Sequence, residues 1–383
     1  MTGQRTQQML ADVRTLVEVE SPTADPAAIG RSTAAVTALG TRLLGVAPQT
    51  AGEPTNPVLI WDFGPGLPGR QVLLLAHHDT VWPVGSWDSL WREEAGRAYG
   101  PGVFDMKAGL VQVFHAVAAI PVAARGGIVV MVTSDEETGS VHSKALISQY
   151  AARAGVALVA EAAAESGALK TARRGIAHYR LNVTGRAAHA GLDPEAGINA
   201  GVEAAYQVLA IAALQAAHPE VTLTPTTIQA GTTINTVPGA ATVAVDLRTA
   251  TLGDLDAIDQ ALRALRPVDQ RTRIEVTQLF ANPPVEPSHT AALFALAGQV
   301  AAALGQPAPV GVAVGGGSDG NTAAAAGAMV LDGLGAVGGG AHAAGEHIEV
   351  AHLAPRTELL QGLIQAVLDG RVQFPIPKEA VRA

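Results

Sequence analysis

The sequence predicts an α/β fold: a domain with a mixed, partly parallel sheet flanked by helices, interrupted by a smaller inserted α+β domain. Three observations favour this class. The chain has 383 residues, which is long for one small domain. Apolar runs of strand length alternate with segments of helical spacing, as in sheets with parallel pairs. Near residue 172 the pattern changes to strict alternation, which indicates a sheet with one solvent-exposed face.

The first segment, residues 1–172, begins with two predicted helices. Met9, Val13 and Leu16 recur at helical spacing, and Ser21-Pro22 ends the first helix. Continuous apolar runs then predict buried strands, and a stretch rich in Trp, Gly and Pro is expected to form a long loop. In chain order we expect helices at 4–19 and 26–45, strands at 58–61 and 72–75, a loop at 80–103, a helix from about 106, a strand at 128–132, a helix at 141–152 and a strand at 156–160.

The inserted segment is expected to span residues 173–283. Tyr179, Leu181 and Val183 alternate with polar residues, which is typical of a half-buried strand. The expected order of strand, helix, two strands, helix and strand is the split βαβ pattern, with a four-stranded sheet and two helices. Its later elements are expected at 196–215, 221–230, 241–248, 254–265 and 273–280.

The last segment, residues 284–383, is expected to return to the first domain. It follows Asn282-Pro283-Pro284, which we interpret as a linker. Its expected elements are a helix at 290–304, a Gly-rich loop at 315–320, a strand at 329–331 and a helix at 352–369.

Composition excludes several classes of partner and site. The net charge is −9 and basic residues form no block, which argues against nucleic acid or an anionic membrane. Cysteine is absent, so a metal would have to be held by His, Asp and Glu. The N-terminus lacks the apolar core of a signal peptide, and no 18 consecutive residues are apolar. We therefore expect a cytoplasmic protein with no membrane partner.

Two groups of polar residues follow predicted strands. Asp135, Glu136 and Glu137 belong to the stretch Thr133–Gly139, which follows the strand at 128–132, where open α/β sheets place their chemistry. Taken alone, such a stretch is more often an acidic turn. His77 and Asp79 follow the strand at 72–75 and share one side of it, so Asp79 can orient a metal-binding His77. A single His-x-Asp is weak evidence.

Three further residues supply hard or borderline metal ligands. Asp105 lies among glycines before a predicted helix, where it is either a ligand or the N-cap of that helix. Glu161 directly follows the strand at 156–160, a place where an isolated acid is usually a turn residue. His342 lies in a Gly-rich loop after the strand at 329–331.

Together these residues suit a site for two metal ions. Two Zn²⁺ carry a charge of +4, which three carboxylates and one hydroxide would neutralise, as a partly buried site requires. Asp105 can bridge both ions, with the other ligands divided as His77 with Glu161 and Glu137 with His342. Glu136 then remains beside the site and can accept a proton. This pattern predicts a two-metal hydrolase.

In these residues the sequence resembles the M20 family of di-zinc metallopeptidases and amidohydrolases, which includes glutamate carboxypeptidase and succinyl-diaminopimelate desuccinylase. The matching motifs occur in family order: His77-His78-Asp79-Thr80-Val81, Gly100-Pro101-Gly102 through Asp105-Met106-Lys107-Ala108-Gly109, Asp135-Glu136-Glu137-Thr138-Gly139, Glu161, and Gly338-Gly339-Gly340-Ala341-His342. The resemblance implies a catalytic domain with an inserted lid or dimerisation domain. It also implies that Asp105 bridges the metals through a segment with a cis bond to Met106, that Glu136 is the general base, and that Asp79 orients His77.

The inserted segment carries further family motifs. Gly185 to Gly191 resembles the lid motif in which His189 reaches the active site of the partner subunit and stabilises the oxyanion. Asn235 and Arg248 match positions that contact the substrate carboxylate, for which the planar fork of arginine is suited. Gly316 and its neighbours can add backbone amides to that pocket.

One departure concerns specificity. Glutamate-releasing relatives carry an arginine where the lid returns to the catalytic domain, but this chain has Phe280-Ala281-Asn282-Pro283-Pro284 there. Arg173 and Arg174, at the other junction, are candidates to replace it.

The expected function is hydrolysis of an amide next to a free carboxylate, in a peptide or an N-acyl amino acid, with two Zn²⁺ as cofactors. Co²⁺ or Mn²⁺ would also suit the ligands. The expected assembly is a homodimer formed through the lid. The alternatives are an aminopeptidase of the same family acting on short peptides, a monomeric amidase, and a non-catalytic metal-binding relative.

Overall fold

The computed structural model describes residues 2–372, so the last residues of the predicted third segment lie outside the described part. The described chain forms two compact units. Unit 1 contains residues 2–172, 287–314 and 318–372, and unit 2 contains residues 173–286 and 315–317.

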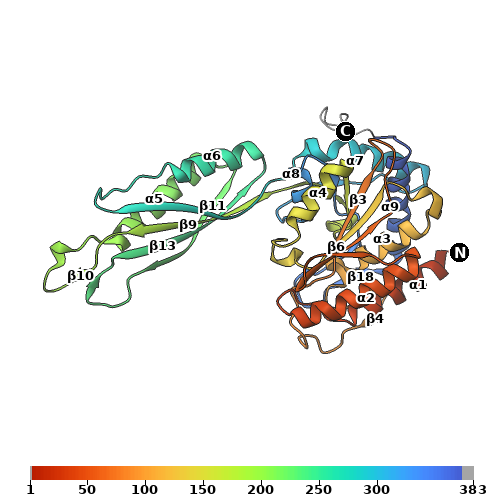
Figure 1. Ribbon diagram of the computed structural model, residues 1–383, viewed down its shortest axis with the longest axis horizontal. Coiled ribbons are helices and arrows are strands. Elements are labelled where there is room, and N and C mark those ends of the chain that lie inside the picture. Colours follow the sequence, from red (N-terminus) through yellow and green to blue (C-terminus); the bar gives the residue numbers. More distant parts are fainter. Residues whose placement is uncertain (1, 373–383) are drawn as a thin grey trace. The chain divides into compact units, whose positions relative to one another are not determined.

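Unit 1 is built on a six-stranded mixed sheet (Figure 1). In spatial order its strands are β1 (Gln49–Glu53), β2 (Asn56–Asp62), β6 (Ile128–Thr133), β3 (Val72–His77), β7 (Val156–Val159) and β16 (Met329–Leu331). The last four run parallel, whereas β1 and β2 pair antiparallel at one edge. All residues of β3, β6 and β7 are buried, which explains their continuous apolar sequences.

Helices pack on both faces of this sheet. One group consists of α1 (Thr2–Val17), α2 (Pro26–Leu44), α3 (Ala108–Ala118) and α9 (Leu353–Leu368), which pack on one another and on β2 and β3. The second group, α4 (Lys144–Ala154) and α8 (Asp319–Ala325), packs on β3 and β7, and α7 (Pro287–Ala303) packs on β16 and α9. The core includes an edge-to-face contact between Trp61 and Phe114, with ring centroids 5.1 Å apart.

The prediction of one long loop over 80–103 is wrong. This segment contains a hairpin of β4 (Arg92–Glu94) and β5 (Arg97–Tyr99), which joins β18 (His347–Glu349) and β17 (Gly338–Gly339) in a second sheet. The hairpin escaped prediction because β4 is wholly exposed and charged, so its strand form depends on pairing with distant residues. A further two-stranded sheet pairs β8 (Leu169–Arg173) with β15 (Gly311–Val314).

Unit 2 has a four-stranded antiparallel sheet and two helices. The sheet order is β11 (Thr222–Ala230), β13 (Ala240–Thr249), β9 (Gly175–Thr184) and β14 (Arg273–Asn282), and the helices are α5 (Ala200–Ala217) and α6 (Leu252–Arg263). A short ribbon pairs β10 (Ala188–His189) with β12 (Thr236–Val237). Tyr179, Leu181 and Val183 are buried and alternate with less buried residues, as the sequence pattern predicted. With both sheets in place, the fold-class prediction is confirmed.

Helix α5 is, among the described residues, the one helix long and apolar enough to cross a membrane by length and composition. The apolar composition of α5 is also explained by its packing within unit 2. Glu203 is buried on its inner side, where the carboxylate accepts hydrogen bonds from Gln207 and from the amides of Val268 and Asp269. The helix packs on β11, β13 and β9 of unit 2, and its outer face carries exposed apolar residues.

Candidate metal centre

The predicted ligands of unit 1 meet at one edge of the main sheet. His77 is the last residue of β3 and lies opposite Thr133, the last residue of β6. Glu161 follows β7, the parallel strand on the other side of β3. Because parallel strands bring their carboxyl ends to the same edge, residues far apart in the sequence become neighbours here.

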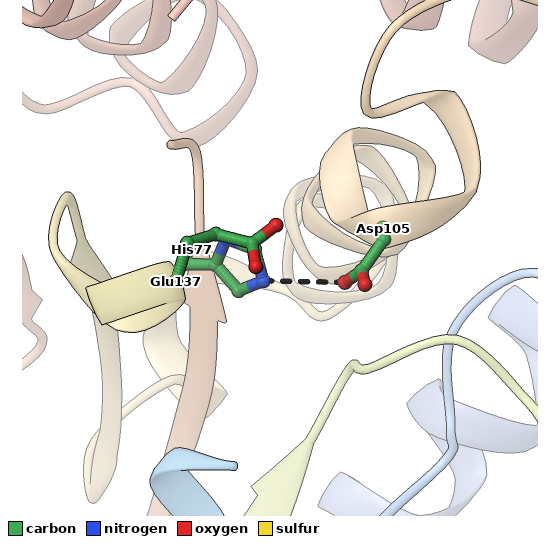
Figure 2. A group of neighbouring side chains, drawn as sticks. All are labelled: His77, Asp105 and Glu137. Atoms are coloured by element: carbon green, nitrogen blue, oxygen red, sulfur yellow. Dashed lines mark ion pairs between the residues drawn. The ribbon is translucent and has the colours of Figure 1, made fainter. Parts of the chain in front are cut away.

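His77, Asp105 and Glu137 converge at this edge (Figure 2). One ligand atom from each lies within 4.8 Å of the others, and the same holds for His77, Glu136 and Glu161. The Nε2 atom of His77 is 3.4 Å from Asp105 Oδ1 and 3.4 Å from Glu161 Oε1. These distances are long for hydrogen bonds, although they suit atoms that share a cation.

His342 completes this group from the Gly-rich loop. Its Nε2 atom is 3.0 Å from Glu137 Oε2 and 3.4 Å from Asp105 Oδ2. Its φ of 58° lies in the left-handed region, which is uncommon for a residue other than glycine. The structure therefore brings all five predicted ligands together, with Asp105 between His77 and His342.

The cluster fits divalent cations on chemical grounds. His77 Nε2 is buried and, within the described chain, makes no hydrogen bond. Burial would lower the pKa of His77, but contacts with Asp105, Asp79 and Glu161 hold it well above 6.5. Burial also raises the pKa of Glu137. A buried imidazole nitrogen together with several carboxylates is a set of ligands that binds Zn²⁺ and similar ions.

Asp79 holds the other side of the His77 ring. Its Oδ1 atom is 3.3 Å from His77 Nδ1, and its backbone oxygen is 3.1 Å from the same nitrogen. The carboxylate in turn accepts hydrogen bonds from the amide of Glu137 at 3.1 Å and from the hydroxyl of Thr23 at 2.7 Å. Thus Asp79 fixes the imidazole and the turn bearing Glu137, whereas His78 points elsewhere and contacts Ser32 at 2.9 Å.

Glu136 lies on the turn that follows β6 and is linked to the cluster electrostatically. Burial raises its pKa well above the usual range, an effect that His77 opposes and Asp319 reinforces. Asp319 accepts hydrogen bonds from Thr133, at 3.0 Å, and from Ser140, so it ties both ends of this turn to α8. The pKa of Asp319 is itself raised by burial to about 6.

The segment around Asp105 is not a helix cap. Helix α3 begins at Ala108 with Lys107 at the N-cap position, which overturns the alternative that Asp105 caps a helix from Met106. The peptide bond between Asp105 and Met106 is cis, as the resemblance implied.

Glu346 is the residue that the sequence analysis missed. It is fully buried, and its carboxylate accepts hydrogen bonds from the amides of Gly102, Phe104 and Asp105 at 2.9–3.0 Å and from the Trp82 indole at 2.7 Å. One carboxylate thus holds the segment that presents Asp105. Its only signal in the sequence is an acid in the loop that follows His342.

Unit 2 holds the remaining predicted site residues. His189 is exposed at the end of β10, and its Nδ1 atom accepts hydrogen bonds from the amides of Gly191 and Leu192 at 3.1 and 3.0 Å. The ring proton therefore lies on Nε2, which can donate. The backbone oxygen of Asn235 accepts from the Ala190 amide at 2.8 Å, so Asn235 and His189 are neighbours.

Arg248 lies near the opposite end of β13 from this ribbon. Its guanidinium donates to both carboxylate oxygens of Asp246 at 2.9 and 3.0 Å. Although burial would raise the pKa of Asp246, Arg248 and His178 lower it. The Gly316 carbonyl accepts a hydrogen bond from Arg173 at 3.0 Å, so Arg173 shapes the Gly-rich loop.

The fold and this cluster define the class of protein. An α/β sheet that gathers imidazole and carboxylate ligands at its carboxyl edge is the framework of a metal-dependent hydrolase. The chain belongs to peptidase family M20/M25/M40, whose model matches residues 73–366. The family resemblance of the motifs is thereby confirmed.

Two named proteins are similar in sequence to this chain over most of its length. Carboxypeptidase G2 of Pseudomonas sp. (strain RS-16) is 31% identical over 315 residues, which cover 80% of this chain and 76% of that protein. A succinyl-diaminopimelate desuccinylase of Leptothrix cholodnii is 28% identical over 336 residues, covering 81% of this chain and 86% of that protein.

Solved structures share the fold. Aminopeptidase PepT of Bacillus cereus has a TM-score of 0.70 and 23% identity, covering 94% of this chain and 98% of its own. The M20 family metallo-carboxypeptidase Sso-CP2 of Sulfolobus solfataricus has a TM-score of 0.67 and 15% identity, covering 94% and 99%. At these identities the likeness concerns the fold alone.

Proposed function

We propose that this protein hydrolyses an amide bond next to a free carboxylate, in a short peptide or an N-acyl amino acid. The observation that carries the proposal is the convergence of five ligands with Glu136 at one edge of the sheet. The relatives at 28–31% identity are a carboxypeptidase and a desuccinylase, and both names support this reaction over an aminopeptidase.

The five ligands would hold two divalent metal ions, with Zn²⁺ as the first choice and Co²⁺ or Mn²⁺ as alternatives. Asp105 would contact both ions, because its two oxygens face His77 on one side and His342 on the other. Glu161 lies on the His77 side and Glu137 on the His342 side. When bound, such ions polarise the scissile carbonyl and lower the pKa of a water molecule.

Glu136 is the proposed general base. It accepts a proton from the attacking water and later returns it to the leaving nitrogen. The raised pKa of Glu136 suits this exchange, because a carboxylate of raised pKa holds a proton more readily than one in water. Asp79 is a positioning residue that keeps His77 directed at the cluster.

His189, Asn235 and Arg248 are the proposed substrate contacts of the lid. His189 donates from Nε2 to the developing oxyanion. Arg248, whose Nε and Nη2 atoms already donate to Asp246, pairs with the free carboxylate through its remaining N–H groups. Arg248 lies eight residues beyond Ala240 along β13, which at about 3.3 Å per residue separates it from the β10–β12 ribbon by roughly 25 Å. One small substrate cannot span that distance, which supports a site that uses the lids of two subunits.

The surface of unit 2 supports a homodimer. Strand β11 lies at the edge of its sheet and is mostly exposed, so its backbone can pair with a second copy. Beside it, α5 exposes Val202, Tyr206 and Leu209 at helical spacing, with 52%, 47% and 66% of each residue accessible. Pairing of two such surfaces would bury both the strand edge and this apolar face.

The two arginines at the first junction bear on specificity for glutamate. Arg173, a candidate to replace the missing lid-exit arginine, directs its Nη1 atom to the carbonyls of Gly316 and Gly317 at 3.0 and 2.9 Å. Arg174 donates to the hydroxyl of Thr222 at 3.0 Å. Both guanidinium groups therefore have structural partners within unit 2.

The proposal is tested with zinc- or cobalt-loaded enzyme and a panel of N-acyl amino acids and dipeptides, with released amine as the readout. Cleavage of substrates with a blocked N-terminus and a free carboxylate is the expected result. Cleavage confined to peptides with a free N-terminus would instead assign an aminopeptidase.

A further inference from the structure

An open pocket of about 470 Å³ adjoins the candidate metal centre in unit 1. The loop between α1 and α2 and the loop after β3 form its walls, and Glu137 forms part of its lining. Glu137 also belongs to the ligand cluster. A group bound in this pocket would therefore lie directly beside the bond that is hydrolysed.

The two walls are joined before any ligand binds. The Thr80 amide donates to the Ser21 oxygen at 2.8 Å, and the Thr23 amide donates to the Thr80 oxygen at 3.2 Å. A β-bridge between Pro22 and Thr80 lies at the same place. Because backbone hydrogen bonds fix both loops, the pocket is largely preformed.

Two polar side chains that line the pocket already have partners within unit 1. The Asp25 carboxylate caps α2 by accepting from the amides of Ala27 and Ala28 at 2.9 and 3.0 Å. The Thr138 hydroxyl donates to the Asp135 oxygen at 3.2 Å. Among the described residues that line the pocket, none is Lys, Arg or His.

What remains for a ligand is an apolar surface beside negative charge. Pro22, Pro83, Val81 and Val84 line the pocket, and 40% of Val81 and 50% of Val84 are exposed. An anionic group would lose its hydration here and gain no cationic partner, while facing Asp25. An uncharged aliphatic or aromatic group would instead bury apolar area against these side chains.

We propose that this pocket binds the acyl half of the substrate and selects an uncharged apolar acyl group. The inference rests on the proposed amide hydrolysis, in which the free carboxylate is assigned to residues of unit 2. The apolar pocket of unit 1 then receives the other half, the group attached to the scissile carbonyl. A succinyl group, which ends in a carboxylate, is disfavoured, although the chain resembles succinyl-diaminopimelate desuccinylases.

The decisive comparison uses two acyl groups of the same shape on one amino acid. A 4-methylpentanoyl group has the heavy-atom skeleton of a succinyl group but ends in two methyl groups instead of a carboxylate. With metal-loaded enzyme, kcat/KM is expected to be at least about 10-fold higher for the 4-methylpentanoyl substrate. Equal or higher kcat/KM for the succinyl substrate would overturn the pocket assignment and leave amide hydrolysis standing.

Variants locate the effect in the pocket. Val84→Asp is expected to lower kcat/KM for the 4-methylpentanoyl substrate about 10-fold and to leave the N-acetyl substrate within about 2-fold, because acetyl is too short to depend on the pocket. Val122→Asp is the matched control, since Val122 is 74% exposed and precedes β6 at the other end of that strand. An equal effect of both substitutions would contradict the assignment.

A binding measurement separates this inference from the reaction. Saturation-transfer NMR would compare 4-methylpentanamide with succinamate on the metal-loaded protein. Binding of the first alone, lost in Val84→Asp, would support the pocket even if no N-acyl amino acid were hydrolysed, in which case the proposed reaction would fail by itself. Failure of 4-methylpentanamide to bind, or equal binding of both, would overturn the pocket.

Discussion

Replacement of Glu346 by glutamine tests how the segment bearing Asp105 is held. One carboxylate oxygen accepts from the amides of Phe104 and Asp105, and the other accepts from Gly102 and the Trp82 indole. Glutamine keeps one oxygen and places an amino group at the other position. Two buried donors would then face a donor and lose their acceptor.

The expected loss of stability is worked out from those two donors. A buried donor without an acceptor costs about 1–3 kcal/mol, so Glu346→Gln is expected to reduce the free energy of unfolding by about 2–6 kcal/mol. Because the Glu346 carboxylate holds the segment that presents Asp105, the affinity for zinc should fall as well, by about 10- to 100-fold as for other residues that orient metal ligands.

Two assays check this prediction. Urea unfolding of the metal-free protein measures stability, and competition with a zinc indicator measures affinity. Glu53→Gln, on the exposed part of β1, is the control and should change neither quantity. A Glu346→Gln variant with wild-type stability and wild-type zinc affinity would refute the assigned role.

Two further outcomes are expected. Leu209→Asp on the exposed face of α5 should shift the protein from dimer to monomer in light scattering, whereas Val122→Asp should leave it a dimer. The dimer proposal would be contradicted if the wild type were a monomer or if the Leu209→Asp variant remained a dimer. Burial lowers the pKa of His115 below 6.5 although Asp12 opposes this, so the unfolded state takes up this proton first as pH falls. The contribution of neutral His115 to stability is therefore complete above pH 6.5 and declines below it. In urea unfolding, the difference in free energy of unfolding between the wild type and His115→Asn should shrink between pH 7.5 and about 5.5. A difference that stays constant would refute this.

The buried part of the fold could be predicted because its strands are uniformly apolar. The strand predicted at 329–331 is β16, and those near 72, 128 and 156 correspond to β3, β6 and β7. Strand β1 and the β4–β5 hairpin could not be found in the same way. Their residues are polar and largely exposed, so pairing partners elsewhere in the chain determine their form.

The candidate ligands were predictable because each has a chemical signature and follows a strand or a Gly-rich turn. The groups that position them have no such signature. Glu346 bonds mainly to backbone amides, which any sequence provides, and Thr23 reaches Asp79 only because two loops are paired through Thr80. Such supporting contacts depend on three-dimensional arrangement and cannot be read from spacing along the chain.

In the proposed metal-dependent hydrolysis, Glu136 moves the proton while other residues hold the ions. The most direct measurement is the turnover and the metal content of Glu136→Ala, made on the same preparation. We expect two ions per chain, as in the wild type, with kcat lowered by roughly 10² or more. Near wild-type turnover with the metal content intact would contradict it.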